Sequence, residues 1–284
     1  MVRLSAVQPC CLLRACLKDV LCYLSYKKQK GPYMFLRILT ATALITAPVF
    51  AAAQDAQNEV SFWLGLGPDL EPGYFGDADQ DAGVGFKFAI DTVKIGPVSR
   101  EPGQATGLGF GPSVRYITGR DADDFEELAG LATIDPSLEL GGRVSYAAPS
   151  FELFASLRYG AVGHKSFVSE VGGDLIYRPT DNIRLSAGPR VLWGDEDYAN
   201  TYFGISADEA LASTVFGDAF EAGSGMISAG AELEAVYEVS DNWQVVGTIT
   251  YDKLRGDAAD SPISESDEQI STQIVLTRKI TFNF

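Results

Sequence analysis

QISTQIVLTRKITFNF, residues 269–284, alternates apolar and polar side chains along almost its whole length and ends in phenylalanine. A period of two is the pattern of a β-strand with one apolar face. That face carries six apolar side chains: Ile270, Ile274, Leu276, Ile280, Phe282 and Phe284. In a soluble protein a long exposed apolar edge strand would promote aggregation. The run predicts the closing strand of an outer-membrane β-barrel, with Phe282 and Phe284 at its terminus; the alternative is an edge strand of a soluble β-sandwich.

A secretory signal peptide is predicted near the beginning of the chain. Met34 and Arg37 precede an apolar run, residues 38–50, that ends in Ala51-Ala52-Ala53. A positive charge, a short apolar run and an A-x-A site are typical of a cleaved export signal, and the run is too short to span a bilayer as a helix. We expect a signal peptide at residues 34–53 and a barrel at 54–284. Residues 1–33 are interpreted as an upstream extension before the true start, the alternative being an unusually long beginning of the signal.

Charge and cysteine content exclude several classes of function. All four cysteines lie in residues 1–53, so the exported part contains no disulfide framework. Residues 54–284 carry 15 basic and 37 acidic side chains, a net charge of −22. Nucleic acid is excluded as a partner because it requires a basic surface.

An all-β fold is expected, a transmembrane antiparallel up-and-down β-barrel of about ten strands. Each strand keeps the period of two over roughly ten residues, which is the length of a tilted membrane strand. Several apolar faces carry aromatic residues at the strand ends, as the interfacial girdles of a membrane barrel do. The ten strands are residues 59–67, 83–90, 107–116, 136–146, 151–159, 167–177, 183–193, 225–238, 243–254 and 269–284. A further hairpin within residues 92–106 would make twelve.

The connections between strands are alternately short and long. Residues 147–150, 178–182 and 239–242 form tight turns, whereas four long segments intervene: residues 118–135, 160–166, 194–224 and 255–268. Short periplasmic turns and long extracellular loops are the rule in such barrels, which places the C-terminus in the periplasm. In the longest loop we expect a helix at residues 207–213 with Ser206 as its N-cap, folded over the barrel mouth.

No catalytic constellation is recognised by spacing. The only histidine, His164, precedes Ser166 by two residues, and this H-x-S pattern is similar to that of outer-membrane lipid A deacylases. No acidic partner can be identified by spacing, so His164 and Ser166 are weak candidates and no catalytic residue is expected. Acidic clusters at residues 121–124, 195–197 and 264–268 are interpreted as solvated loop charge, and neither a metal nor a cofactor is expected.

Several loop segments resemble the MltA-interacting protein (MipA/OmpV) family of outer-membrane proteins. The segments are GPSVRY at residues 111–116, DY at 197–198, TYFGIS at 201–206, SDNW at 240–243 and LRGDAADSP at 254–262. The motif positions are Gly119, Arg120, Asp121, Tyr202, Phe203, Gly204, Asp257, Asp260, Ser261 and Pro262. The resemblance covers almost all of the exported chain. It implies a barrel without catalytic residues that brings together a murein hydrolase and a murein synthase.

The sequence therefore favours a non-enzymatic scaffold in the outer membrane of a Gram-negative cell. Its expected partners are outer-membrane lipid and lipopolysaccharide, the barrel insertion machinery, and enzymes that remodel peptidoglycan. A small porin-like channel for cations or polar solutes is the main alternative, because charged residues alternate onto the lumen face. A lipid-modifying barrel enzyme is a third and less favoured hypothesis.

Overall fold

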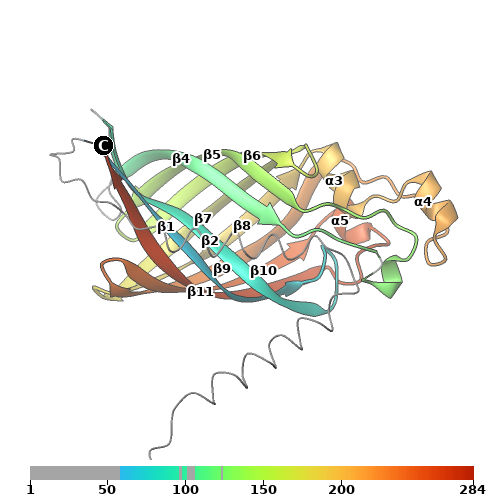
Figure 1. The fold of residues 1–284 in the computed structure, drawn as a ribbon. Helices are drawn as coiled ribbons and strands as arrows, with labels where there is room; N and C mark the ends of the chain where they lie inside the picture. Colours follow the sequence, from blue (N-terminus) through green and yellow to red (C-terminus); the bar gives the residue numbers. More distant parts are fainter. Residues whose placement is uncertain (1–57, 96–97, 101–105, 123) are drawn as a thin grey trace, which may run out of the picture. The chain divides into compact units, whose positions relative to one another are not determined.

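Antiparallel strands make up one curved sheet in the computed structural model, which describes residues 58–95, 98–100, 106–122 and 124–284 (Figure 1). The expected leader and signal peptide lie outside these residues. Ten strands are long and β3 has three residues. The strands are β1 Glu59–Pro72, β2 Gln80–Ile95, β3 Val98–Arg100, β4 Gly107–Ile117, β5 Ser137–Ala148, β6 Phe151–Val162, β7 Phe167–Thr180, β8 Ile183–Gly194, β9 Gly225–Ser240, β10 Trp243–Leu254 and β11 Glu268–Asn283.

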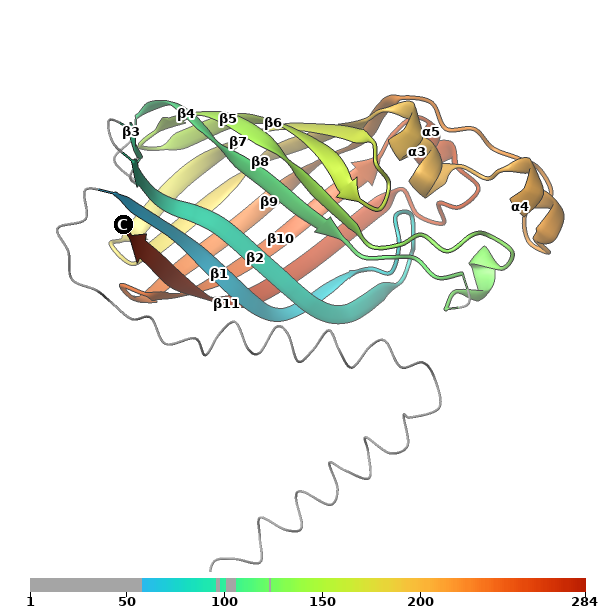
Figure 2. The same cartoon turned by 45° about the horizontal axis from the view of Figure 1, so that its top comes forward.

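The sheet closes by pairing its first long strand with its last. Its order is β3-β2-β1-β11-β10-β9-β8-β7-β6-β5-β4, and every pairing is between antiparallel neighbours. The closing strand β11 pairs with β1 on one side and β10 on the other, as the alternation predicted. Within the described residues no backbone pairing joins β2 to β4, so a seam remains between these two strands (Figure 2). The expected ten-stranded barrel is confirmed in a nearly closed form.

The two faces of each strand differ as a membrane barrel requires. On β11, Leu276 is 50% exposed on the outer face whereas its neighbour Thr277 is fully buried in the lumen. Tyr146, Tyr177 and Trp243 lie exposed near strand ends, where an interfacial girdle is expected. The outer surface is therefore an apolar band with aromatic rims.

The two ends of the barrel also differ. The tight turns at residues 149–150, 181–182 and 241–242 lie at the end that holds the C-terminus, and the long loops lie at the other end (Figures 1 and 2). The long loops carry the helices: η1 Glu126–Leu128, α3 Glu196–Phe203, α4 Ala207–Ala212 and α5 Asp257–Asp260. No helix among the described residues is long and apolar enough to cross a membrane.

One of the two helices in the longest loop was predicted and the other was missed. Helix α4 begins after Ser206, which forms a capping box with Glu209, as expected. Helix α3 was interpreted as part of an aromatic loop. Its start was marked in the sequence by Asp195, whose side chain accepts a hydrogen bond from the backbone of Tyr198, and by two acidic residues in the first turn.

Candidate functional site

Helix α3 packs across the mouth of the barrel and forms its lid. Tyr198, Tyr202 and Phe203 point into the largest apolar cluster and are almost fully buried. The cluster joins the lid to the upper ends of the strands and to α5, through Ile117, Val168, Leu192, Ile227, Leu254 and Ala258. Aromatic side chains bury the most apolar surface per residue, so these three contribute most to holding the lid in place. Burial raises the pKa of the Tyr198 hydroxyl.

The family-like segments meet at this lid. The Nη1 of Arg120 donates to the backbone carbonyl of Tyr202 at 3.2 Å, and the Ser261 hydroxyl donates to that of Phe203 at 2.6 Å. The Tyr202 hydroxyl donates to Ser137 Oγ at 3.0 Å. The β4–β5 loop, the start of β5 and the β10–β11 loop are thus tied to the last turn of α3, which is capped by Gly204.

The other motif residues lie in the loops around α3, and two of them form hydrogen bonds there. Asp257 accepts a hydrogen bond from the backbone N–H of Gly223 at 2.7 Å, and Asp121 accepts one from Thr133 at 3.3 Å. The three remaining positions, Gly119, Asp260 and Pro262, lie in the loops that frame the lid. The motif residues therefore form the extracellular cover of the barrel, and two of them, Arg120 and Tyr202, also line the cavity beneath it.

His164 lies directly beneath the lid and has an acidic neighbour. Its Nδ1 accepts the backbone N–H of Ser166 at 3.2 Å and lies 2.5 Å from the Ser166 hydroxyl. Its Nε2 lies 3.4 Å from Glu139, which spacing alone did not reveal because 25 residues separate the two in the sequence. The structure thus brings the candidates His164 and Ser166 together with a carboxylate. Knowledge of the β5–β6 register would have placed Glu139 opposite Gly160, next to the loop that carries His164.

This trio is sealed from solvent and from lipid. The side chains of His164 and Glu139 are fully buried, and Ser166 is 2% exposed. The rings of Tyr198 and Tyr202 pack against the imidazole with centroid distances of 5.1 and 5.8 Å. A nucleophile must reach the atom that it attacks, and the Ser166 hydroxyl is covered on this side by the lid. The geometry favours a role in anchoring the loop between β6 and β7 under α3.

Replacing His164 with alanine is expected to leave the lipid A and phospholipid profiles of the cell unchanged, because Ser166 is inaccessible to an acyl chain. Mass spectrometry of extracted lipids measures this directly. Ser166→Ala serves as the second variant, since an enzyme would lose activity in both. Accumulation of the same acylated lipid in both variants would contradict the structural interpretation.

Below the lid, ion pairs join strands along the inner wall of the barrel, and two of them, Lys87–Glu234 and Asp91–Lys279, join strands that are not neighbours in the sheet. Arg158, 4% exposed, binds Glu139 at 2.8 Å and Glu170 at 2.9 Å. Arg190 binds Asp174 at 2.9 Å and Glu232 at 3.1 Å. Nearer the tight turns, Glu234 pairs with Arg184 and Lys87, and Asp91 pairs with Lys279. These pairs link β2, β5, β6, β7, β8, β9 and β11 through the interior.

Phe154 interrupts the polar face of β6 and lies among these charges. The guanidinium of Arg143 lies 3.6 Å from its ring centroid and that of Arg190 lies 4.9 Å from it. Cations over an aromatic face are stabilised by the quadrupole of the ring. The one apolar residue on this lumen-facing run therefore holds two arginines in place.

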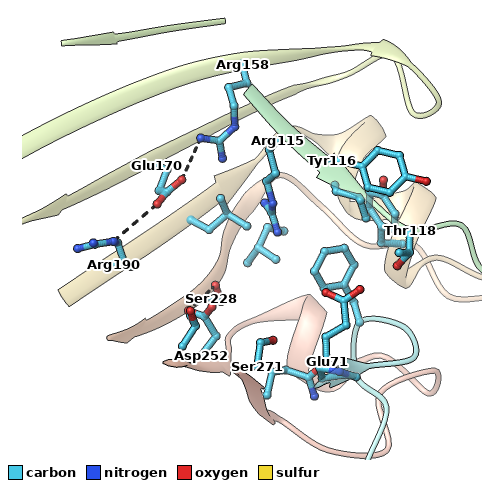
Figure 3. A pocket seen from close by; sticks show the side chains of 18 of the residues that line it. Glu71, Arg115, Tyr116, Thr118, Arg158, Glu170, Arg190, Ser228, Asp252 and Ser271 are labelled. Atoms are coloured by element: carbon cyan, nitrogen blue, oxygen red, sulfur yellow. Dashed lines mark hydrogen bonds and ion pairs between the residues drawn. The ribbon is translucent and has the colours of Figure 1, made fainter. Parts of the chain in front are cut away.

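A cavity of about 540 Å³ lies between the lid and the ion pairs. Figure 3 shows Arg115 projecting into it, with Arg158 and Glu170 on one side and Asp252, Ser271 and Glu71 on the other. Its volume falls within the range of small-ligand pockets.

Three acidic residues gather in the extracellular loops outside this cavity. Carboxylate oxygens of Asp77, Glu127 and Glu265 lie within 4.8 Å of one another. Burial raises the pKa of Asp77 and of Glu265, and the neighbouring carboxylates add to both shifts. Asp77 already accepts the backbone N–H groups of Gly73 and Asp79, so its oxygens are engaged in shaping the loop.

Comparison with known proteins identifies an outer-membrane protein family. The family model described as MltA-interacting protein MipA matches residues 64–280. A stretch of 79 residues is 35% identical to outer membrane protein OmpV of Vibrio cholerae serotype O1 and 34% identical to outer membrane protein Omp26La of Vibrio anguillarum. The stretch spans 28% of this chain and 29% of each relative, less than a third of their length.

A solved structure of similar architecture is an outer membrane channel from Pseudomonas putida F1. The similarity covers 84% of this chain and 99% of that one, at 9% identity and a TM-score of 0.42. The family match, the two named relatives and the nearly closed antiparallel sheet define the class of protein as an outer-membrane β-barrel. The chain belongs to the MltA-interacting protein MipA family and is located in the outer membrane.

Proposed function

We propose that this barrel is a non-enzymatic scaffold that holds peptidoglycan-remodelling enzymes at the outer membrane. The observation that carries the proposal is the inner wall of the barrel, where ion pairs join seven strands beneath a packed lid. These pairs favour a rigid body, because moving one strand past another would separate charges that are largely withdrawn from water. The family description, which names an interaction with MltA, supports a murein hydrolase as the partner.

The periplasmic end is the surface that such a partner would reach. Its turns are short and polar, and Asp181 and Asp241 are exposed at their tips. The turn between β5 and β6 is fixed to the next one along, since Arg178 donates to the carbonyl of Pro149 at 3.0 Å. Fixed turns of this kind would hold the carboxylates of Asp181 and Asp241 in a constant arrangement for a partner.

Capture of envelope proteins on the immobilised barrel tests the proposal. We expect retention of a murein hydrolase, identified by mass spectrometry, and at least a severalfold loss of it when Asp181 and Asp241 are both changed to lysine. The control changes Asp208 and Asp218, exposed in the extracellular loop, to lysine. Retention no greater than on an unrelated barrel, or equal loss in both variants, would contradict the scaffold.

A channel for small polar solutes is a second candidate function. It is favoured by the cavity under the lid, which is lined by charged and hydroxyl side chains. In this function the lid would control entry, and its removal should produce a conductance.

A further inference from the structure

The cavity under the lid contains one basic side chain that has no polar partner. Arg115, on β4, forms no hydrogen bond or ion pair with any described residue, and its guanidinium carbon lies 5.8 Å from the centroid of the Phe75 ring. The other basic residues that line the cavity each have a polar partner: Lys87, Arg120, Arg143, Arg158 and Arg190. Arg115 is thus the basic residue of this lining whose guanidinium is attracted by carboxylates at a distance but is bound directly by none of the described residues.

Arg115 forms no direct ion pair because the carboxylate opposite it in the sheet is already bound by another arginine. Arg115 is directly opposite Glu139 in the β4–β5 ladder, the position from which a cross-strand ion pair would form. The Glu139 carboxylate instead binds Arg158 at 2.8 Å and lies against His164. The guanidinium of Arg115 turns into the cavity, as Figure 3 shows.

Two acidic side chains line the same cavity without a direct ion pair to any described residue, although Arg115 attracts both across the space. The carboxylate of Glu71, near the end of β1, forms no hydrogen bond or ion pair within the part of the chain that the structure describes. Asp252, on β10, accepts only the Ser228 hydroxyl, at 3.3 Å. Figure 3 places both on the wall that faces Arg115, with the cavity between them. Half-buried charges of opposite sign therefore face one another across a space large enough for a solute.

We propose that this cavity is a binding site for a small zwitterion, an amino acid or a short peptide. The solute carboxylate would bind Arg115, whose planar guanidinium suits two parallel hydrogen bonds, and the solute ammonium would bind Glu71 and Asp252. A purely anionic solute would leave both carboxylates unpaired and would be repelled by them, whereas a purely cationic solute would leave Arg115 unpaired. The hydroxyls of Ser113, Thr118 and Ser271 supply further polar contacts.

Calorimetric titration of the purified full-length barrel in detergent micelles tests this site with three probes. They are alanylalanine, its N-acetyl derivative, which has lost the cation, and its C-terminal amide, which has lost the anion. We expect measurable binding of alanylalanine and at least tenfold weaker binding of both derivatives. Equal binding of the acetylated probe would identify an anion site and overturn the proposal, and so would the absence of binding of alanylalanine at millimolar concentration.

Arg115→Gln is expected to weaken the binding of alanylalanine at least tenfold. The matched control is Arg278→Gln, which removes an arginine from the exposed face of β11 and should leave the affinity unchanged. Asp252→Asn provides a second variant in case Arg115→Gln does not fold, as judged by heat-modifiable migration on gels. Unchanged affinity in a folded Arg115→Gln or Asp252→Asn barrel would overturn the site. This binding test does not depend on the scaffold proposal, because the capture of enzymes tests the periplasmic turns at the other end of the barrel.

Discussion

Arg158→Met is expected to destabilise the barrel by about 3 to 5 kcal/mol, the cost of breaking a buried ion pair by removing one partner. Arg158 is 4% exposed and bridges Glu139 and Glu170, while it also donates to Ser113 at 3.2 Å. Without it, the fully buried Glu139 carboxylate loses its strongest partner. Urea unfolding in micelles, followed by tryptophan fluorescence, should show the transition at lower urea.

Arg143→Met is the matched control for this prediction. Arg143 pairs with Glu152 at 3.0 Å, but their side chains are 35% and 27% exposed, so the loss of the pair should cost about 1 kcal/mol or less. Changing Arg158 to methionine and Glu139 to leucine together should recover part of the lost stability, because no orphaned carboxylate remains at that position. Equal unfolding midpoints for the two single variants would contradict the role of the lumen network.

The barrel was predictable from sequence because each strand repeats the same two-residue pattern. The closing strand shows this best: its apolar residues lie outside and its lumen-facing residues pair or pack inside. Strand ends were less predictable. Pro68 and Asp69 break the alternation of β1, yet they pair with Val84 and Gly83 of β2, since pairing depends on the partner strand as well as on the pattern.

The site was less predictable than the fold because its partners are brought together by register. Glu139 could not be assigned to His164 from spacing, and Phe154 was recognised only as an interruption of a polar face. The structure explains Phe154 by the two arginines stacked on it. Arg115 was also not recognised as a site residue. It stands out only because the carboxylate opposite it, Glu139, binds Arg158 instead, and that requires knowledge of the contacts of the neighbouring side chains.

Changing Tyr198 and Phe203 of α3 to alanine is expected to release the lid and to open the mouth of the barrel. Both side chains are fully buried, and removal of a buried aromatic side chain typically costs about 3 to 5 kcal/mol. The strands should remain intact because their pairing does not involve α3. In planar bilayers we expect the variant to show discrete conductance steps, whereas the unmodified barrel should be silent or nearly so.

Leu211→Ala is the control for this double variant. Leu211 lies on α4 in the same loop but is 86% exposed, so its truncation should change neither stability nor conductance. Protease cleavage in the loop should increase only in the double variant, which separates release of the lid from unfolding of the barrel. A silent double variant with a released loop would mean that side chains below the lid close the lumen without it, and would contradict the channel as a second function. Steady conductance of the unmodified barrel would instead show that neither lid nor ion pairs block the passage, and the channel would then replace the scaffold as the main function.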